Sequence, residues 1–382
     1  MQTSASDINW TRLLPSRRFT TSLESLVESH VGKVVLLTGA GGCIGSALAK
    51  TLLRGRPRHV VLLDHSERAL YELVSELASL PQTATYRAVL GDVRDELLLQ
   101  SLMQESRPDL ILHAAAFKHV PLMEENPFAA VGNNALAAWQ LLRVAADFRV
   151  PRFLLISTDK AANPRGIMGA SKRLAELAVS HWSEGQRDYR AIRLGNVIGS
   201  QGSVVPLFLE QIARGGPVTV TDSEVTRFFL TLGDTVQLIL AAAAFEGTSG
   251  LLLPELGEPI KIAELASYLI QQNGASDSAK RHAPKIEIQF TGLRPGDKLS
   301  EDLISIGETL HPTSDPQLQR VSGSIPPAAA VEKTFARLKE AVEARDLART
   351  LEAVRELAPE YAPSEMLLRL AGDRTPAAST HE

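Results

Sequence analysis

The sequence predicts an α/β fold in which a doubly wound parallel sheet is joined to a smaller C-terminal lobe. Apolar runs rich in Val, Leu and Ile alternate with helix-length stretches through the first 200 residues. Such runs are typical of parallel strands that helices cover on both faces. A glycine-rich turn joins the first run to the first helical stretch. Beyond residue 200, shorter segments follow, broken by Pro206, Gly215 and Pro217.

Six apolar runs predict the strands in order. "KVVLLT" opens the sheet, and the second strand is expected over His59–Asp64. "YRAVLGDVRD", "DLILHAAA", "RFLLISTDK" and "YRAIRLGNVIG" predict the next four. A helix is expected to begin near Gly169, and charged amphipathic helices are expected over 331–357. We therefore expect four parts, namely a peripheral arm over 1–31, a nucleotide-binding domain over 32–200, a substrate lobe over 201–325, and C-terminal helices with a tail over 326–382.

The composition is that of an ordinary globular protein. Of 382 residues, 44% are hydrophobic and 22% are charged, which excludes a disordered chain. The formal charge of −4 offers no basic excess for nucleic acid or anionic lipid. The single cysteine, Cys43, excludes an internal disulfide and a multi-cysteine metal site. No apolar run reaches the ~18 residues of a membrane span. We expect a cytoplasmic protein without a bound metal.

Gly39, Gly42 and Gly45 form a G-x-x-G-x-x-G turn between the first strand and the first helix. Glycine lets the backbone approach a pyrophosphate, which the N–H groups of the helix N-terminus stabilise. An isolated match of this kind would be only a tight turn. Asp64 adds specificity, because it ends the second strand where a carboxylate accepts hydrogen bonds from an adenosine ribose. The carboxylate disfavours a 2′-phosphate, so NAD is favoured over NADP.

Further cofactor contacts are expected along the same sheet edge. Asp92 follows the third strand and is placed to meet the adenine edge. The small side chains of 114–116 end the fourth strand and leave room for the nicotinamide half. The predicted cofactor-binding residues of this edge are Gly39, Gly42, Ile44, Gly45, Asp64, Asp92, Val93, Ala114, Ala115 and Ala116. The domain over 32–200 is thus expected to be an NAD-binding domain of the Rossmann type.

Polar residues end the fifth strand beside the expected cofactor. Thr158, Asp159 and Lys160 are costly there unless they are paired or used in chemistry. Asp159 would act as an acid if burial keeps it protonated, and Lys160 as a base if burial and an oxidised nicotinamide keep it neutral. A structural ion pair at a strand end is the alternative interpretation.

Longer stretches of the sequence make a specific resemblance. They are "TGAGGCIGS", "LLDHSE", "HAAAFKHVPLMEENP", "ISTDKAANPRGIMGASKR", "RLGNVIGSQGSVVPLF", "EVTRFFLT" and "TGLRPGDKLSEDL", over most of 32–305. On these stretches the chain resembles extended short-chain dehydrogenases/reductases and, among them, the CapD-like nucleotide-sugar 4,6-dehydratases of bacterial polysaccharide biosynthesis. That superfamily carries a Y-x-x-x-K pattern, and this chain has Met168 and Lys172 at its two ends. Methionine there is similar to the branch that acts on UDP-N-acetylglucosamine with retention at C5.

The resemblance implies NAD-dependent loss of water from a UDP-sugar, with UDP-N-acetylglucosamine the favoured substrate. Hydride leaves C4 for NAD, a base removes the C5 proton, the C6 hydroxyl departs with help from an acid, and hydride returns to C6. Lys160 is the expected base, Asp159 the acid and Thr158 a partner of the C4 hydroxyl. Lys172 is expected to hold the nicotinamide ribose, and Met168 to line the site.

Substrate contacts are expected at Lys118, His119, Asn134, Asn196, Arg227 and Arg294. Asn196 and Arg294 resemble residues that bind the nucleotide diphosphate, and the arginine fork pairs well with phosphate oxygens. A structural histidine at His119 and a surface salt bridge at Arg227 are the alternatives. We also expect a homo-oligomer.

Two other functions stay open. A UDP-sugar 4-epimerase would need the tyrosine that Met168 replaces, and would have no use for Asp159 and Lys160. A non-catalytic NAD-sensing scaffold on the same fold would be expected to lose the set Thr158–Lys160, which is intact.

Overall fold

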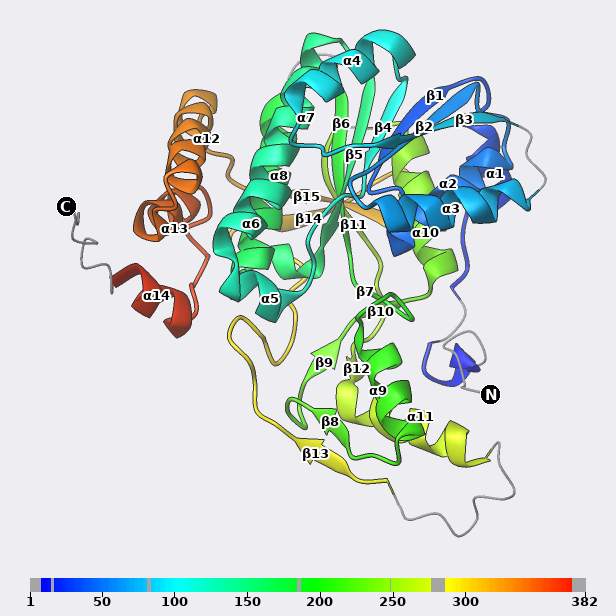
Figure 1. The fold of residues 1–382 in the computed structure, drawn as a ribbon, viewed down its shortest axis with the longest axis vertical. Coiled ribbons are helices and arrows are strands. Elements are labelled where there is room, and N and C mark those ends of the chain that lie inside the picture. The colour runs from blue at the N-terminus through cyan, green and yellow to red at the C-terminus, as the bar shows by residue number, and fades with distance from the viewer. Residues whose placement is uncertain are drawn as a thin grey trace, which may run out of the picture.

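A large sheet forms the main body of the computed structural model (Figure 1). The structure describes residues 8–14, 17–80, 84–183, 187–247, 249–275 and 286–372. The strands of this sheet are β1 (Val34–Thr38), β2 (His59–Asp64), β3 (Thr85–Leu90), β4 (Leu110–His113), β5 (Arg152–Thr158), β6 (Asp188–Leu194), β11 (Gly250–Pro254), β14 (Thr309–Pro312) and β15 (Leu318–Ser322).

The order of the nine strands is β14-β15-β11-β6-β5-β4-β1-β2-β3. All neighbours from β11 to β3 are parallel, whereas β15 and β14 add an antiparallel edge. The central order 3-2-1-4-5-6 is that of a doubly wound nucleotide-binding sheet. The predicted fold class is confirmed, and β2 has the predicted bounds.

Helices cover both faces of the sheet. On one face lie α2 and α3 with α10, and on the other α4, α7 and α8 (Figure 1). The helices of this body are α1 (Leu23–Glu28), α2 (Cys43–Leu53), α3 (Glu67–Ala78), α4 (Glu96–Ser106), α5 (Val120–Glu125), α6 (Pro127–Val131), α7 (Ala137–Asp147), α8 (Ile167–Trp182) and α10 (Leu232–Ala244). A π-helical turn, Gly132–Leu136, precedes α7, and a 3₁₀ turn, Asp159–Ala161, follows β5. The helix predicted near Gly169 is α8.

The smaller lobe has a hydrophobic core of its own, below the carboxyl ends of the parallel strands (Figure 1). Its elements are α9 (Val204–Ala213), β8 (Val218–Val220), β9 (Thr226–Arg227), β12 (Ile260–Lys261), α11 (Ile262–Ala275) and β13 (Ile288–Phe290). The short pair β7 (Asn196–Val197) and β10 (Phe229–Leu230) lies where the chain passes between the two bodies. This arrangement leaves the strand ends of the sheet facing the lobe.

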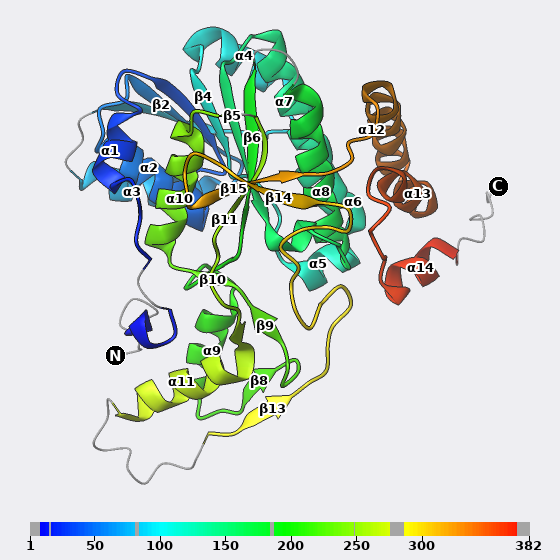
Figure 2. The same ribbon diagram turned by 180° about the vertical axis from the view of Figure 1, so that it is seen from behind.

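The predicted part 201–325 supplies more than the lobe. From it, α10, β11, β14 and β15 return to the main body, as the view from behind shows (Figure 2). The predicted arm 1–31 is also packed at two places. Residues around Ile8 join the core of the small lobe, and Leu26 of α1 joins that of the main body. The division at residue 200 stays a prediction.

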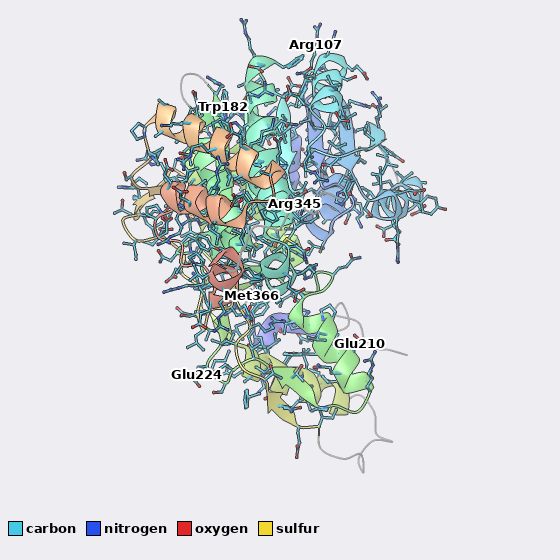
Figure 3. All side chains as sticks on the ribbon, turned by 60° about the vertical axis from the view of Figure 1, so that its left-hand side comes forward. Arg107, Trp182, Glu210, Glu224, Arg345 and Met366 are labelled. Carbon is cyan, nitrogen blue, oxygen red and sulfur yellow. The ribbon has the colours of Figure 1, made fainter. Side chains whose placement is uncertain are left out.

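Two of the C-terminal helices, α12 (Ala328–Glu343) and α13 (Leu347–Leu357), pack on α8, and the third, α14 (Glu365–Gly372), contacts α13. This confirms the helices predicted over 331–357. Phe335 of α12 stacks on Trp139 of α7, with ring centroids 4.2 Å apart, and Trp182 of α8 lies beside Trp139. Figure 3 labels Trp182. The predicted tail beyond Gly372 lies outside the described residues.

Candidate active site

The glycine turn fits a dinucleotide because its backbone leaves no room for side chains. Gly39 has a φ of +67°, and a Cβ there would lie 2.6 Å from the backbone nitrogen of Ala115. A Cβ on Gly45 would overlap the carbonyl oxygen of Gly39. Gly42 caps α2 with no side chain over its free N–H groups. Such a bare cradle at a helix N-terminus suits a pyrophosphate.

Two predicted cofactor carboxylates are held in place. Asp64 is buried, and its two oxygens accept the N–H groups of Gly41 and Ser66, each at 2.8 Å. Asp92 pairs with Arg94, whose Nη2 lies 2.5 Å from Oδ2. The Arg94 hydrogen bond lowers the pKa of Asp92. Asp64 therefore ties the glycine turn to the end of β2.

The other predicted cofactor residues lie at the same edge of the sheet. The N–H of Ala114 donates to the oxygen of Thr38 at 3.1 Å, which continues the β1–β4 pairing past His113. Val93 is buried, and the half-buried Ile44, Ala114 and Ala115 pack on the main core. The structure thus brings the residues expected from β1 to β4 to one edge.

The predicted acid–base residues form one hydrogen-bonded cluster at the end of β5. Thr158 Oγ1 donates to Asp159 Oδ1 at 2.9 Å, and Lys160 Nζ donates to the same oxygen at 3.0 Å. Lys160 Nζ also donates to Asn196 Oδ1 at 2.8 Å, so this predicted substrate residue belongs to the cluster. Asp159 is wholly buried, and its Oδ2 has no hydrogen-bond partner among the described residues. One carboxylate oxygen is therefore left for a further donor.

Lys160 is charged in this setting. Burial opposes the ammonium form, but the carboxylates of Asp159 and Glu301 outweigh burial and raise the pKa of Lys160 above its usual range. Burial alone therefore does not make Lys160 neutral, and the expectation that burial acts together with an oxidised nicotinamide stays a prediction. Two negative neighbours decide the charge, and only one of them is adjacent in the sequence.

Glu301 is the site residue that the sequence analysis missed. Its Oε1 lies 3.6 Å from Lys160 Nζ and 3.2 Å from Arg227 Nε, and its side chain is 3% exposed. Arg227 is buried as well, and its Nη atoms donate to the backbone oxygens of Thr226, Lys298 and Leu299. The salt bridge of Arg227 is thus an interior one, not a surface pair. The motif "RPGDKLSEDL" is the only signal that could have pointed to Glu301.

The helix α8 presents Met168 and Lys172 beside this cluster. A Cβ on Gly169 would overlap the carbonyl oxygen of Lys160, so glycine allows α8 to pack directly on the 3₁₀ turn. Lys172 Nζ donates to the oxygen of Ile156 at 2.8 Å, and burial lowers the pKa of Lys172 to about 8. Met168 is 3% exposed and belongs to the main core.

Asn134 acts within the chain, on the π-helical turn. Its Oδ1 accepts the N–H of Phe117 at 2.8 Å, and its Nδ2 donates to Phe117 O and Ser171 Oγ. Phe117 follows the alanine run that ends β4, and Ser171 is next to Lys172. Asn134 thus fixes the loop after β4 against α8.

The remaining predicted substrate residues lie on the loops around the cluster. Lys118 Nζ donates to Gln201 O at 2.7 Å, and the His119 ring lies against Gly202. Burial lowers the pKa of both Lys118 and His119. The side chain of Arg294 is 58% exposed and pairs with Asp297 at 3.0 Å.

A buried ionic network lies next to the cluster, between the end of β5 and α8. Glu176 of α8 accepts from Ser157 Oγ at 2.7 Å and from two nitrogens of Arg193, at 2.9 and 2.7 Å. Glu308 accepts from Arg193 and from Arg173, each at 2.7 Å. Ser157 directly precedes Thr158, so the network fixes the end of β5 against α8.

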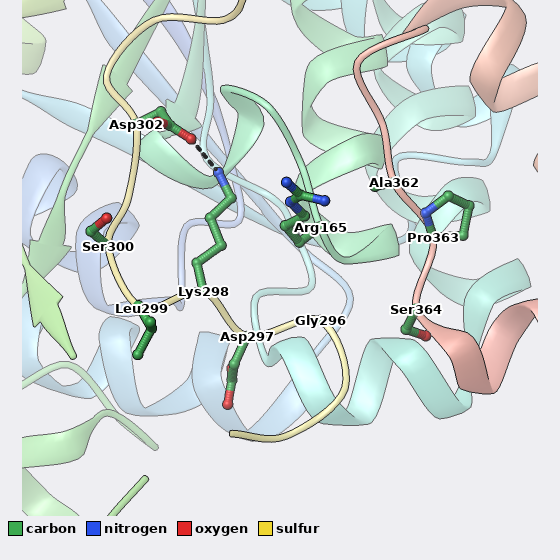
Figure 4. Close-up of a pocket in the computed structure, with 10 residues that line it drawn as sticks. All are labelled: Arg165, Gly296, Asp297, Lys298, Leu299, Ser300, Asp302, Ala362, Pro363 and Ser364. Atoms are coloured by element: carbon green, nitrogen blue, oxygen red, sulfur yellow. Dashed lines mark hydrogen bonds and ion pairs between the residues drawn. The ribbon is translucent and has the colours of Figure 1, made fainter. Parts of the chain in front are cut away.

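The C-terminal segment 362–364 contacts the loop between the 3₁₀ turn and α8. The N–H of Ala362 donates to Pro164 O at 3.1 Å. Ser364 Oγ donates to Glu124 Oε2 at 2.6 Å, while Glu124 Oε1 accepts the N–H of Ile167 at the start of α8. A cavity of about 430 Å³ lies between this segment, Arg165 and the loop 296–302 (Figure 4).

Within the described part of the chain, no group of three His, Cys, Asp or Glu side chains is placed to hold a metal ion. Nor is any described helix long and apolar enough to cross a membrane.

Comparisons with known proteins agree with the fold. The chain is 40% identical to the capsular polysaccharide biosynthesis protein CapD of Staphylococcus aureus, over 73% of this chain and 46% of that one. It spans about half the length of CapD and of the probable polysaccharide biosynthesis protein EpsC of Bacillus subtilis. It is 33% identical to an inverting UDP-N-acetylglucosamine 4,6-dehydratase of Campylobacter jejuni, over 72% of this chain and 78% of that one.

Solved structures show the same fold. Pen from Bacillus thuringiensis matches with a TM-score of 0.66 and 28% identity, over 73% of this chain and 87% of that one. The dTDP-glucose 4,6-dehydratase DesIV of Streptomyces venezuelae, solved with NAD, matches with a TM-score of 0.61 and 24% identity, over 70% of this chain and 87% of that one. The family model described as polysaccharide biosynthesis protein matches residues 35–322. By that match, the chain belongs to the polysaccharide biosynthesis protein family.

Proposed function

We propose that this chain removes water from UDP-N-acetylglucosamine with bound NAD and forms the 4-keto-6-deoxy sugar for glycan synthesis. The observation that carries the proposal is the hydrogen-bonded cluster of Thr158, Asp159 and Lys160 at the end of β5, in the same sheet as the strand β1 that leads into the glycine turn. An acid and a base in contact at a cofactor edge are what an elimination needs. The relatives CapD and the Campylobacter dehydratase support the same reading.

The cofactor would be held by the bare glycine turn, by Asp64 and by Lys172. When bound, NAD supplies the acceptance of a hydride from C4 and its return to C6. Asp64 favours NAD, because a 2′-phosphate would meet a buried carboxylate. Lys172 reaches the site from the core side, where its Nζ donates to Ile156 O and burial lowers its pKa to about 8.

The proton of the C4 hydroxyl goes to Asp159 through Thr158. The thioether of Met168 cannot accept a proton, so another group must do so. Thr158 Oγ1 already donates to Asp159 Oδ1, and a sugar hydroxyl donating to Thr158 completes that chain. Asp159 thereby becomes the neutral acid that protonates the departing C6 hydroxyl. The C4 hydroxyl proton and the C6 hydroxyl leave together as the water that is lost.

Lys160 exchanges the second proton, which belongs to C5. Once Asp159 is neutral, Lys160 loses one of the two carboxylates that raise its pKa, so its amine is freed to act as base. It removes the C5 proton during elimination and gives it back when the hydride reaches C6. Asn196 keeps the amine in place, since its Oδ1 accepts from Nζ at 2.8 Å.

A UDP-sugar 4-epimerase is the second candidate. It is favoured by 33% identity to a UDP-glucose 4-epimerase of Rickettsia akari, over 72% of this chain and 78% of that one. Against it stands Lys160, because epimerisation removes a proton only from the C4 hydroxyl and has no C5 step in which a lysine base would act.

In the test, the purified chain is incubated with NAD and UDP-N-acetylglucosamine, and the molecular mass of the product is measured by mass spectrometry. Loss of one water, abolished in Asp159→Asn, supports the proposal. An unchanged mass with altered configuration by NMR supports the epimerase. Bound NAD without any change in the sugar supports a non-catalytic scaffold and refutes both enzymes.

A further inference from the structure

Glu301 reaches the acid–base cluster from a distant part of the sequence. It lies 141 positions after Lys160, in the loop between β13 and β14. Its Oε1 faces Lys160 Nζ at 3.6 Å, and its Oε2 is buried without a hydrogen-bond partner among the described residues. Leaving a carboxylate oxygen buried and unbonded costs free energy, so its placement calls for a reason.

The chain holds this carboxylate firmly in position. The guanidinium of Arg227 pairs with Glu301 through Nε at 3.2 Å and donates to the oxygens of Lys298 and Leu299. The N–H of Thr226 donates to Leu299 O at 2.8 Å, which fixes the loop on β9. The loop is thus fastened to the small lobe while Glu301 faces the end of β5.

We propose that Glu301 is a positioning residue for Lys160, which holds the amine against Asp159 and Asn196 and sets the pH at which that amine loses its proton. The inference rests on the proposed function only in giving Lys160 the role of base. Asp159 has to exchange protons with the sugar, so a second carboxylate keeps Lys160 oriented while Asp159 is neutral.

The charges around Lys160 give the expected size of the effect. Asp159 of the 3₁₀ turn and Glu301 are the negative groups, Arg227 of β9 is a positive one, and Lys298 Nζ lies 3.8 Å from Glu301 Oε2. A unit charge at 3.6 Å shifts a titration by about one to three pH units for a dielectric between water and a protein surface. Removing the charge of Glu301 makes the amine easier to deprotonate.

The test compares Glu301→Gln with Asp302→Asn in the chain of 382 residues. Asp302 is the next residue, is 49% exposed and pairs with Lys298, and it makes no ion pair with Lys160. The protein is labelled with ¹³C at lysine Cε, and the signal that disappears in Lys160→Met identifies Lys160. We expect its titration midpoint to fall by about one pH unit or more in Glu301→Gln, and to stay unchanged in Asp302→Asn.

Activity gives the second readout. In Glu301→Gln the acid limb of kcat for water loss should move to lower pH while KM changes little, and Glu301→Asp should restore part of the wild-type profile. An unmoved Lys160 signal in a folded Glu301→Gln protein, or an equal movement in Asp302→Asn, would overturn the proposal. If Glu301→Gln does not fold, the comparison uses Glu301→Asp, which keeps the charge, and Glu301→Ala. The titration midpoint of Lys160 must then lie nearer to the wild-type value in Glu301→Asp than in Glu301→Ala. If the Lys160 midpoint moves in Glu301→Gln but the wild type removes no water from the sugar, the proposed function is refuted. The effect of Glu301 on the titration of Lys160 would still hold.

Discussion

Arg193 should be the most sensitive charged residue for stability, because it joins two buried carboxylates behind the catalytic strand. Its side chain is wholly buried, and it pairs with Glu176 and Glu308, whose side chains are 1% and 4% exposed. It also donates to Leu303 O at 3.0 Å. Arg193→Met keeps the length but leaves Arg173 alone to neutralise both carboxylates. Breaking a buried pair in this way typically costs about 3–5 kcal/mol.

This cost translates into a measurable shift of the unfolding curve. For 382 residues, the entropy of unfolding is about 0.8 kcal/mol per degree, so Tm should fall by roughly 4–6 °C. Urea unfolding followed by circular dichroism gives the free energy, with Arg369→Met as the control. Arg369 is 77% exposed and pairs with Glu365, so its removal should cost less than about 1 kcal/mol. If Arg193→Met were as stable as that control, the buried network would not hold the site.

Three further changes test other parts of the account. Asp64→Ala should weaken the binding of NAD, measured by calorimetry, and should reduce the ratio of the affinity for NAD to that for NADP. A wild type that prefers NADP would contradict the role of Asp64. Met168→Leu should lower the rate of water loss only mildly, since volume and polarity barely change; a loss of a hundredfold would give Met168 a role beyond lining. His30 is 1% exposed, and burial lowers its pKa from 6.5 to about 4. The His30 imidazole binds a proton more readily in the unfolded chain than in the folded one. The free energy of unfolding should therefore fall by about 3 kcal/mol from pH 6.5 down to pH 4. In His30→Gln, urea unfolding at each pH should show a smaller fall of this free energy.

Local pattern was enough to predict most of the fold. Continuous apolar runs identified β1, β2, β4 and β5, because an interior parallel strand is buried on both faces and leaves little else in its sequence. The return of 232–254 and 309–322 to the main sheet could not be predicted in this way. Short strands such as β14, whose residues are all exposed, carry no apolar run. Their place depends on pairing between distant segments.

The site was predictable where its residues are neighbours in the chain. Thr158, Asp159 and Lys160 follow one strand, so their contact follows from the strand itself. Glu301 was missed because nothing local distinguishes a buried glutamate in a loop from an exposed one. Arg227 has a similar explanation: it was expected to contact the substrate or to form a surface salt bridge, and nothing in the sequence indicated that its donors bind backbone oxygens of a loop some 70 residues away. The charge of Lys160 depends on one carboxylate adjacent in the sequence, Asp159, and on one tertiary contact, Glu301.

The most direct test of the account is elimination by Lys160→Ala. The variant should bind NAD and UDP-N-acetylglucosamine as the wild type does, because neither the glycine turn nor Asp64 touches Lys160. Water loss, measured by mass spectrometry of the product, should fall by about 10²–10⁴, the range typical of a general base. In deuterium oxide the wild-type product should carry deuterium at C5, which the variant should fail to introduce at the wild-type rate. Near-normal water loss in Lys160→Ala would contradict the central claim that this lysine moves the C5 proton.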